Sequence, residues 1–164
     1  MLEGSRRPID GRRVLIVDDE PDMRALARFA LELNGSWTVA GEACDGMAAI
    51  CLAAELQPDV VLLDLEMPWL DGAESVPHIR RRSPNALIVV WTSHPHGPRA
   101  ASALELGAHA VIGKGDTPAN RLGDWLVEAM SERPALERSG AASPSEPAPA
   151  AAVAPTRYAS AHPD

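Results

Sequence analysis

Three short runs of apolar residues stand out along the chain, and polar residues bound each of them. They are residues Val14–Val17, Val60–Leu63 and Leu87–Trp91. Each run is continuous rather than alternating, which is typical of strands buried on both faces of a parallel sheet. Residues 37–41 and 108–112 are weaker candidates of the same kind. The pattern therefore predicts five strands.

The segments between these strands carry apolar residues at helical spacing. Pro21 suits a first helical turn, Asp45 suits an N-cap, and Asp71 with Glu74 resembles a capping box. Thr117 is the expected cap of the last helix. Helices are therefore predicted over residues 23–33, 46–56, 71–82, 99–106 and 118–131. Strands and helices alternate five times, which indicates an open, doubly wound α/β sheet.

Polar side chains follow four of the predicted strands at their carboxyl ends, where such sheets bind ligands. Asp18 and Asp19 follow the first strand, Asp64 the third, Thr92 the fourth and Lys114 the fifth. Three neighbouring carboxylates would repel one another unless a cation joined them, and Mg²⁺ prefers such oxygen ligands. A lysine ammonium and a threonine hydroxyl both suit phosphoryl oxygens. The set predicts a carboxylate nucleophile that supports in-line phosphoryl transfer.

Each of these residues alone has a simpler interpretation. An acid pair after a strand is often only a helix cap. Asp64 could be an ordinary loop acid, Thr92 a structural residue and Lys114 a solvated one. Their joint placement at four strand ends favours the functional interpretation.

The order and spacing of these motifs resemble the receiver domain of two-component response regulators over residues 12–132. The segments that carry the resemblance are VLIVDDEPDMR, PDVVLLDLEMPWLDG, VVWTSH and LGAHAVIGKGD. It implies a flavodoxin-like (βα)₅ fold with strand order 2-1-3-4-5. It also implies a signalling domain that accepts a phosphoryl group from a sensor histidine kinase or phosphotransfer protein. The Lys-Gly-Asp ending is more similar to receivers of regulators that usually carry a helix-turn-helix than to the Lys-Pro ending of the wider family.

The resemblance further implies a role for each site residue. Asp64 matches the phosphoacceptor, while Thr92 and Lys114 match the residues that hold the phosphoryl group. The implied Mg²⁺ ligands are Asp19 directly, Asp18 largely through water, Asp64, and the backbone carbonyl of Glu66.

The sequence departs from the family pattern at several positions. Val111 stands where members usually carry an aromatic switch residue, so a different output geometry is expected, through Trp91 or through the face of the last two helices. Trp69 follows Met-Pro where glycine is common, and we expect it to be exposed near the site. Gly115 replaces the commoner proline. His94 and His96 lack further Cys or His partners, so a metal site there is not favoured.

Composition places limits on partners and location. The net charge of −8 argues against direct nucleic-acid binding. No apolar run approaches the roughly 20 residues that span a bilayer, and the first residues do not resemble a signal peptide, so a cytoplasmic protein without membrane insertion is expected. Cys44 and Cys51 are expected to be small core or helix-face residues, because their helical spacing exceeds disulfide reach. Lys114 is the single lysine among 15 basic residues.

The two ends of the chain differ from its middle. Residues 1–11 are expected to form an N-terminal extension. Residues 133–164 are rich in Pro, Ala and Ser and poor in large aliphatic side chains. Such a segment cannot bury enough apolar surface to offset its ordering entropy, so a disordered tail is predicted.

Three functional interpretations remain at this point. The leading one is a phosphorylatable receiver that signals to an unknown output protein by protein–protein contact and is not a turnover enzyme. A homodimer is compatible with the sequence. The second is a constitutive receiver-like binding module that does not switch, an alternative that Val111 keeps open. The third is a dehalogenase-type phosphatase, which fits poorly because Glu66 stands where that family has its second Asp.

Overall fold

The computed structural model describes residues 11–132, which form a five-stranded parallel sheet between two layers of helices. Residues 1–10 and the predicted tail over 133–164 lie outside the described range. The strand order is β2-β1-β3-β4-β5, which confirms the predicted flavodoxin-like fold. All four neighbouring pairs are parallel. The strands are β1 (Arg12–Val17), β2 (Trp37–Ala43), β3 (Val60–Leu63), β4 (Leu87–Thr92) and β5 (Ala110–Gly113).

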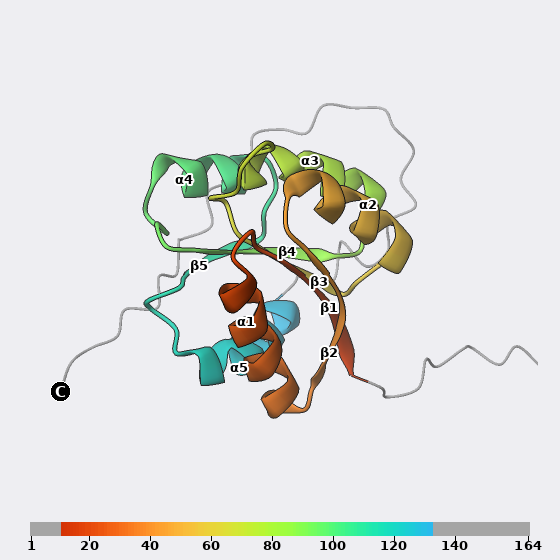
Figure 1. The fold of residues 1–164 in the computed structure, drawn as a ribbon, viewed down its shortest axis with the longest axis vertical. Coiled ribbons are helices and arrows are strands. Elements are labelled where there is room, and N and C mark those ends of the chain that lie inside the picture. Colours follow the sequence, from red (N-terminus) through yellow and green to blue (C-terminus); the bar gives the residue numbers. More distant parts are fainter. Residues whose placement is uncertain (1–10, 133–164) are drawn as a thin grey trace, which may run out of the picture. The chain divides into compact units, whose positions relative to one another are not determined.

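The helices cover the two faces of the sheet unequally (Figure 1). One face carries α2 (Gly46–Leu56), α3 (Gly72–Arg82) and α4 (Pro98–Glu105), and the other carries α1 (Pro21–Asn34) and α5 (Leu122–Ser131). Each face has its own apolar cluster, and the continuous strands supply side chains to both. This double burial is the physical reason why β3 and β4 contain only buried residues.

Side-chain caps set the starts of α2 and α3. The Asp45 carboxylate accepts a hydrogen bond from the Ala48 N–H at 2.8 Å, and the Asp71 carboxylate accepts one from the Ala73 N–H at 2.9 Å, so both predicted caps are confirmed. The predicted start of the last helix is wrong. Pro118 keeps an extended ψ of 139°, a 3₁₀ turn over Ala119–Arg121 follows, and α5 begins without a side-chain cap.

Two other sequence-based expectations concern exposure. Cys44 and Cys51 are both free and exposed, so the helix-face interpretation holds for Cys51 and the core interpretation fails for both. Trp69 is exposed, as expected. None of the helices in residues 11–132 combines the length and the apolar character that a bilayer crossing requires.

Candidate functional site

The main chain of the predicted site residues is held by the sheet itself. Hydrogen bonds of the parallel pairs continue one residue beyond the strands: the N–H groups of Asp18, Asp64 and Lys114 donate to Ala43, Val17 and Thr92 at 3.1, 2.8 and 2.8 Å, respectively. Since the carboxyl ends of parallel strands meet at one edge, these residues converge there. The edge therefore holds Asp18, Asp64 and Lys114 on backbone that is hydrogen-bonded to the neighbouring strands.

Three carboxylates gather at this edge. Asp18 and Asp64 are 1% and 3% exposed, Asp19 is half-buried, and one oxygen from each lies within 4.8 Å of the others. The Asp18 Oδ1 accepts a hydrogen bond from the Glu20 N–H, and the Asp64 Oδ1 accepts one from the Leu65 N–H, both at 2.9 Å. Hard oxygen donors at this spacing fit a divalent cation such as Mg²⁺.

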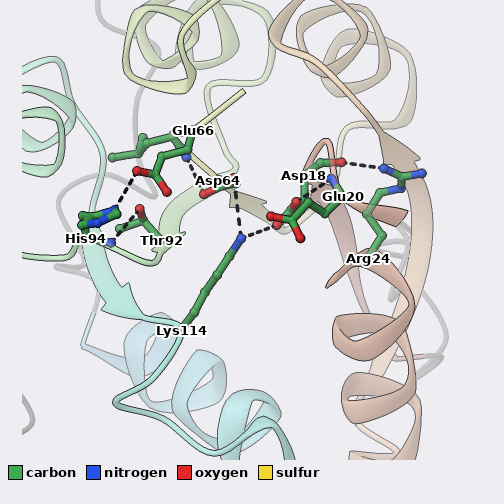
Figure 2. Close-up of polar contacts among 9 residues, drawn as sticks. Asp18, Glu20, Arg24, Asp64, Glu66, Thr92, His94 and Lys114 are labelled. Atoms are coloured by element: carbon green, nitrogen blue, oxygen red, sulfur yellow. Dashed lines mark hydrogen bonds and ion pairs between the residues drawn. The ribbon is translucent and has the colours of Figure 1, made fainter. Parts of the chain in front are cut away.

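Lys114 joins the two buried carboxylates. Figure 2 shows its side chain extending from the loop after β5, with Nζ 2.7 Å from Asp18 Oδ2 and 3.6 Å from Asp64 Oδ2. Burial alone would lower the pKa of Lys114, but its hydrogen bond to Asp18 and the charges of Asp64, Asp18 and Glu20 raise it above the ordinary value. The ammonium therefore stays charged at neutral pH.

Asp64 has a perturbed acidity. Burial raises the pKa of Asp64 from 3.8 to about 6, against the lowering effect of Lys114; the Asp18 charge raises it further, and the N–H groups of Glu66 and Leu65 lower it. An Asp with this pKa is ionised at neutral pH and is more basic than an ordinary one. Such a carboxylate suits a nucleophile better than an exposed aspartate does.

Thr92 and Glu66 lie on the other side of Asp64 from Asp18 (Figure 2). Thr92 is 1% exposed, and its Oγ1 accepts a hydrogen bond from the His94 N–H at 3.3 Å. The Glu66 side chain turns to His94, whose Nδ1 lies 2.6 Å from Glu66 Oε1. These residues line an open cavity of about 240 Å³ that continues to the start of α4. Leu65, the residue that follows Asp64 in the sequence, lines the cavity as well.

Two residues that support the site were missed at the sequence level. The Arg24 guanidinium donates to the Asp18 backbone carbonyl at 2.7 Å and lies 3.4 Å from the Glu42 carboxylate, so it ties the acid pair to α1 and β2. A Cβ on Gly72 would lie 2.1 Å from the Asp64 carbonyl oxygen, so only glycine lets α3 begin this close to Asp64. The Arg in VLIVDDEPDMR and the Gly in PDVVLLDLEMPWLDG were visible signals of both.

Comparison with known proteins agrees with this geometry. The family model of the response regulator receiver domain matches residues 14–122. The chain belongs to this family. It is a signalling domain of the phosphorylation-dependent kind, and the alternative of a constitutive module gains no support from any described feature. Receiver domains bind Mg²⁺ at an acidic pocket and interact with histidine kinases or phosphotransfer proteins, and this chain carries an acidic cluster of Asp18, Asp19 and Asp64.

Individual proteins that contain receiver domains are also similar to this chain. The chemotaxis protein CheY of Thermotoga maritima is 34% identical over 74% of this chain and 97% of its own length. A protein-glutamate methylesterase/protein-glutamine glutaminase of Agrobacterium fabrum is 37% identical over 77% of this chain, and the nitrate/nitrite response regulator NarL of Escherichia coli is 35% identical over 66%. The chain spans 28–40% of the length of three such methylesterases, so the similarity concerns only part of each of those proteins.

Solved structures of receiver domains superpose well. The receiver domain of NarL from Mycobacterium tuberculosis gives a TM-score of 0.69 at 32% identity, with 76% of this chain and 99% of that one covered. The response regulator domain of Thermotoga maritima CheB gives 0.68 at 30% identity, with 76% and 99% covered. This chain thus shares its overall fold with these receiver domains.

Two departures of this receiver domain from the family pattern have clear structural settings. Val111 is partly buried and packs against the cluster under α2, α3 and α4. Trp69 is 97% exposed and has a φ of 74°, a backbone conformation that favours glycine. Because residue 111 is valine, β5 offers no aromatic ring beside Thr92. Trp69 places a large apolar side chain in solvent.

Proposed function

We propose that this receiver domain accepts a phosphoryl group on Asp64 and changes its protein contacts as a result. The observation that carries the assignment is the position of Asp64, which lies buried at the end of the central strand with Lys114 beside it. The Leu65 N–H fixes one carboxylate oxygen, so the orientation of the carboxylate is set before a donor arrives.

The proposed metal ligands are Asp18, Asp19, Asp64 and the backbone carbonyl of Glu66. The close spacing of the three carboxylates supports this set, because acids at that distance call for a cation. Mg²⁺ bound there would neutralise charge on the transferring phosphoryl oxygens.

Lys114 and Thr92 supply the remaining contacts in this proposal. The permanently charged ammonium of Lys114 balances negative charge beside Asp64, and the Thr92 hydroxyl donates to a phosphoryl oxygen from the opposite side. Burial of both side chains removes competing water and strengthens these contacts. The same two groups sense whether the phosphoryl group is present.

The donor in this proposal is a sensor histidine kinase or a phosphotransfer protein, and the output is a contact with another protein. The domain over residues 12–132 then acts as a phosphoacceptor rather than as a turnover enzyme, in the cytoplasm. The relatives carry different whole-protein activities in their names, so their similarity supports the domain's role and favours no particular output.

Intact-mass measurement tests the acceptor assignment. The protein is incubated with Mg²⁺ and acetyl phosphate and quenched in acid, beside Asp64→Asn and the matched control Asp59→Asn. Asp59 lies just before β3, at the opposite end of that strand from Asp64, where it accepts a hydrogen bond from the Arg13 N–H. We expect the parent and Asp59→Asn to gain one phosphoryl mass and Asp64→Asn to gain none.

A gain in Asp64→Asn equal to that of the parent would refute the assignment. If the parent gains no mass, binding of the phosphoryl analogue beryllofluoride decides, because fast hydrolysis can remove an acyl phosphate. Failure of both would contradict the acceptor function and favour a constitutive binding module.

A further inference from the structure

Lys114 has a third neighbour besides the two carboxylates. Its Nζ lies 5.5 Å from the centroid of the Trp91 ring, within the range of a cation–π contact. Both side chains are shielded from solvent, with Trp91 3% and Lys114 11% exposed. Removal from water strengthens such a contact, since the ammonium then has fewer water molecules to satisfy it.

Packing alone does not explain an indole ring at position 91. Within residues 11–132, the buried Nε1 of Trp91 has no hydrogen-bond partner, and an unsatisfied buried donor is unfavourable. Leu or Phe would fill apolar space without that donor. What the indole adds is the strongest π face among the side chains, and Lys114 is the cation placed over it.

Trp91 lies on the other face of the sheet from position 111, where family members usually carry an aromatic residue. Trp91 belongs to the apolar cluster shared with α1 and α5, whereas Val111 packs on the opposite face, under α2, α3 and α4. Along β4, Thr92 follows Trp91 directly, so neighbouring residues of one strand contact the site from different faces. The aromatic ring next to this site is therefore that of Trp91, on the face of the sheet covered by α1 and α5, with the Lys114 ammonium over it.

A π face holds an ammonium in a way that carboxylates do not. Asp18 binds Lys114 directly and is also a proposed metal ligand, so a cation at Asp18 would weaken its hold on the lysine. The ring attracts the charge without taking up an N–H donor, so all three donors stay free for oxygens. The ring thus retains Lys114 near Asp64 while Asp18 is engaged elsewhere.

We propose that Trp91 is a positioning residue for Lys114, and that its ring keeps the ammonium within reach of the phosphoryl group on Asp64. The inference rests on the proposed function. It also predicts that movement of Lys114 on phosphorylation is felt on the face of the sheet covered by α1 and α5.

A spectroscopic test of the contact uses the fact that Lys114 is the only lysine in the sequence. Protein labelled with ¹³C-lysine gives a single set of side-chain signals, whose ε protons should be shifted upfield by the ring current of Trp91. We expect the shift in the metal-free protein and in the protein with Mg²⁺ and beryllofluoride. It should be lost in Trp91→Leu and partly kept in Trp91→Phe.

The functional test measures the rate constant for phosphorylation by acetyl phosphate and Mg²⁺. We expect Trp91→Leu to be about tenfold slower than the parent and Trp91→Phe to be within about threefold of it, because phenylalanine keeps a weaker π face. The control is Trp37→Leu, the same substitution at a second buried indole of the same cluster, whose Nε1 donates to the Gly123 carbonyl. Trp37 begins β2 and pairs with the first residue of β1, so it lies at the end of the sheet opposite to the edge that carries Lys114. We expect the control to lose stability and to keep the parental rate.

Four outcomes would overturn the inference. If the parent accepts no phosphoryl group, the proposed function fails and the role of Trp91 falls with it. If the parent is phosphorylated but Trp91→Leu matches it, or if Trp37→Leu slows equally, only the role of Trp91 falls. If Trp91→Leu does not fold, the parent's own lysine signals decide, since ε protons at their ordinary position in the beryllofluoride state exclude the contact.

Discussion

Replacing Asp64 with Asn should make the metal-free domain more stable at neutral pH, although it removes the proposed phosphoacceptor. The Asp64 carboxylate is 3% exposed and lies beside Asp18, and its pKa is raised to about 6 in the folded chain. Asn has nearly the same shape, and its Oδ1 can still accept the hydrogen bond from the Leu65 N–H. Lys114 keeps its hydrogen bond to Asp18. The substitution therefore removes mainly the cost of a buried charge.

The magnitude follows from the change in acidity on folding. Raising the pKa of Asp64 from 3.8 to about 6 costs the folded state about 3 kcal/mol when the group is ionised in both states. Water that reaches the site reduces this, so the expected gain for Asp64→Asn is about 2 kcal/mol at pH 7.5. A folded pKa above the unfolded one means that the cost is complete above pH 6 and fades as pH falls to 3.8. The stability that Asp64→Asn gains over the parent should thus decrease as the pH falls from 6 to 3.8.

Urea unfolding of the parent and Asp64→Asn in the presence of a chelator measures this difference at pH 7.5 and at pH 4. Asp59→Asn removes the same charge just before β3, away from the carboxylate cluster, and controls for the general effect of net charge. Added Mg²⁺ should stabilise the parent more than Asp64→Asn, because a ligand that binds only the folded state adds to its stability. A variant that is less stable than the parent at pH 7.5, or a difference that does not vary with pH, would refute the reasoning.

Substitutions at three further positions are expected to give distinct results in the same unfolding assay. Gly72→Ala should cost at least about 2 kcal/mol, since its Cβ would meet the Asp64 backbone; an unchanged midpoint would contradict the close approach. Asp45→Ala should cost about 1 kcal/mol through the lost cap on the Ala48 N–H, and Asp45→Asn should recover most of it. Trp69→Gly should cost less than about 0.5 kcal/mol or raise stability, because the indole is 97% exposed at a φ of 74°; a loss typical of buried tryptophan would disprove this.

Much of the fold followed from the sequence because its strands are buried on both faces. Runs such as Val60–Leu63 are continuous and apolar, and this pattern distinguishes parallel strands from the helices between them. The last helix was harder to delimit. Thr117 and Pro118 together look like a cap and a first helical residue, but the chain makes a 3₁₀ turn before α5 begins at Leu122. Local propensity favoured the earlier start, and it does not reveal such a turn.

In the site, the sequence predicted the residues at the strand ends but not the side chains that contact them. Strand ends predicted that Asp18, Asp64 and Lys114 would meet, because topology brings the carboxyl ends together. The sequence did not reveal that the lysine also lies over Trp91, nor that Arg24 holds the Asp18 carbonyl. Such contacts depend on side-chain directions on neighbouring elements, which spacing along the chain does not encode.

The hydrogen bonds that continue past the strands affect how the domain should behave in amide exchange. Binding sites at loop tips commonly exchange fast, because their backbone opens locally at little cost. Here the amides of Asp18, Asp64 and Lys114 are bonded to the neighbouring strands, at 3.1, 2.8 and 2.8 Å. Exchange of these amide protons should require opening of the sheet itself. The amides at the edge that carries the proposed site would then be among the slowest of the domain to exchange. Substituted side chains there would then sit on a backbone that hardly moves, which makes this edge a suitable frame for new acidic or metal-binding chemistry.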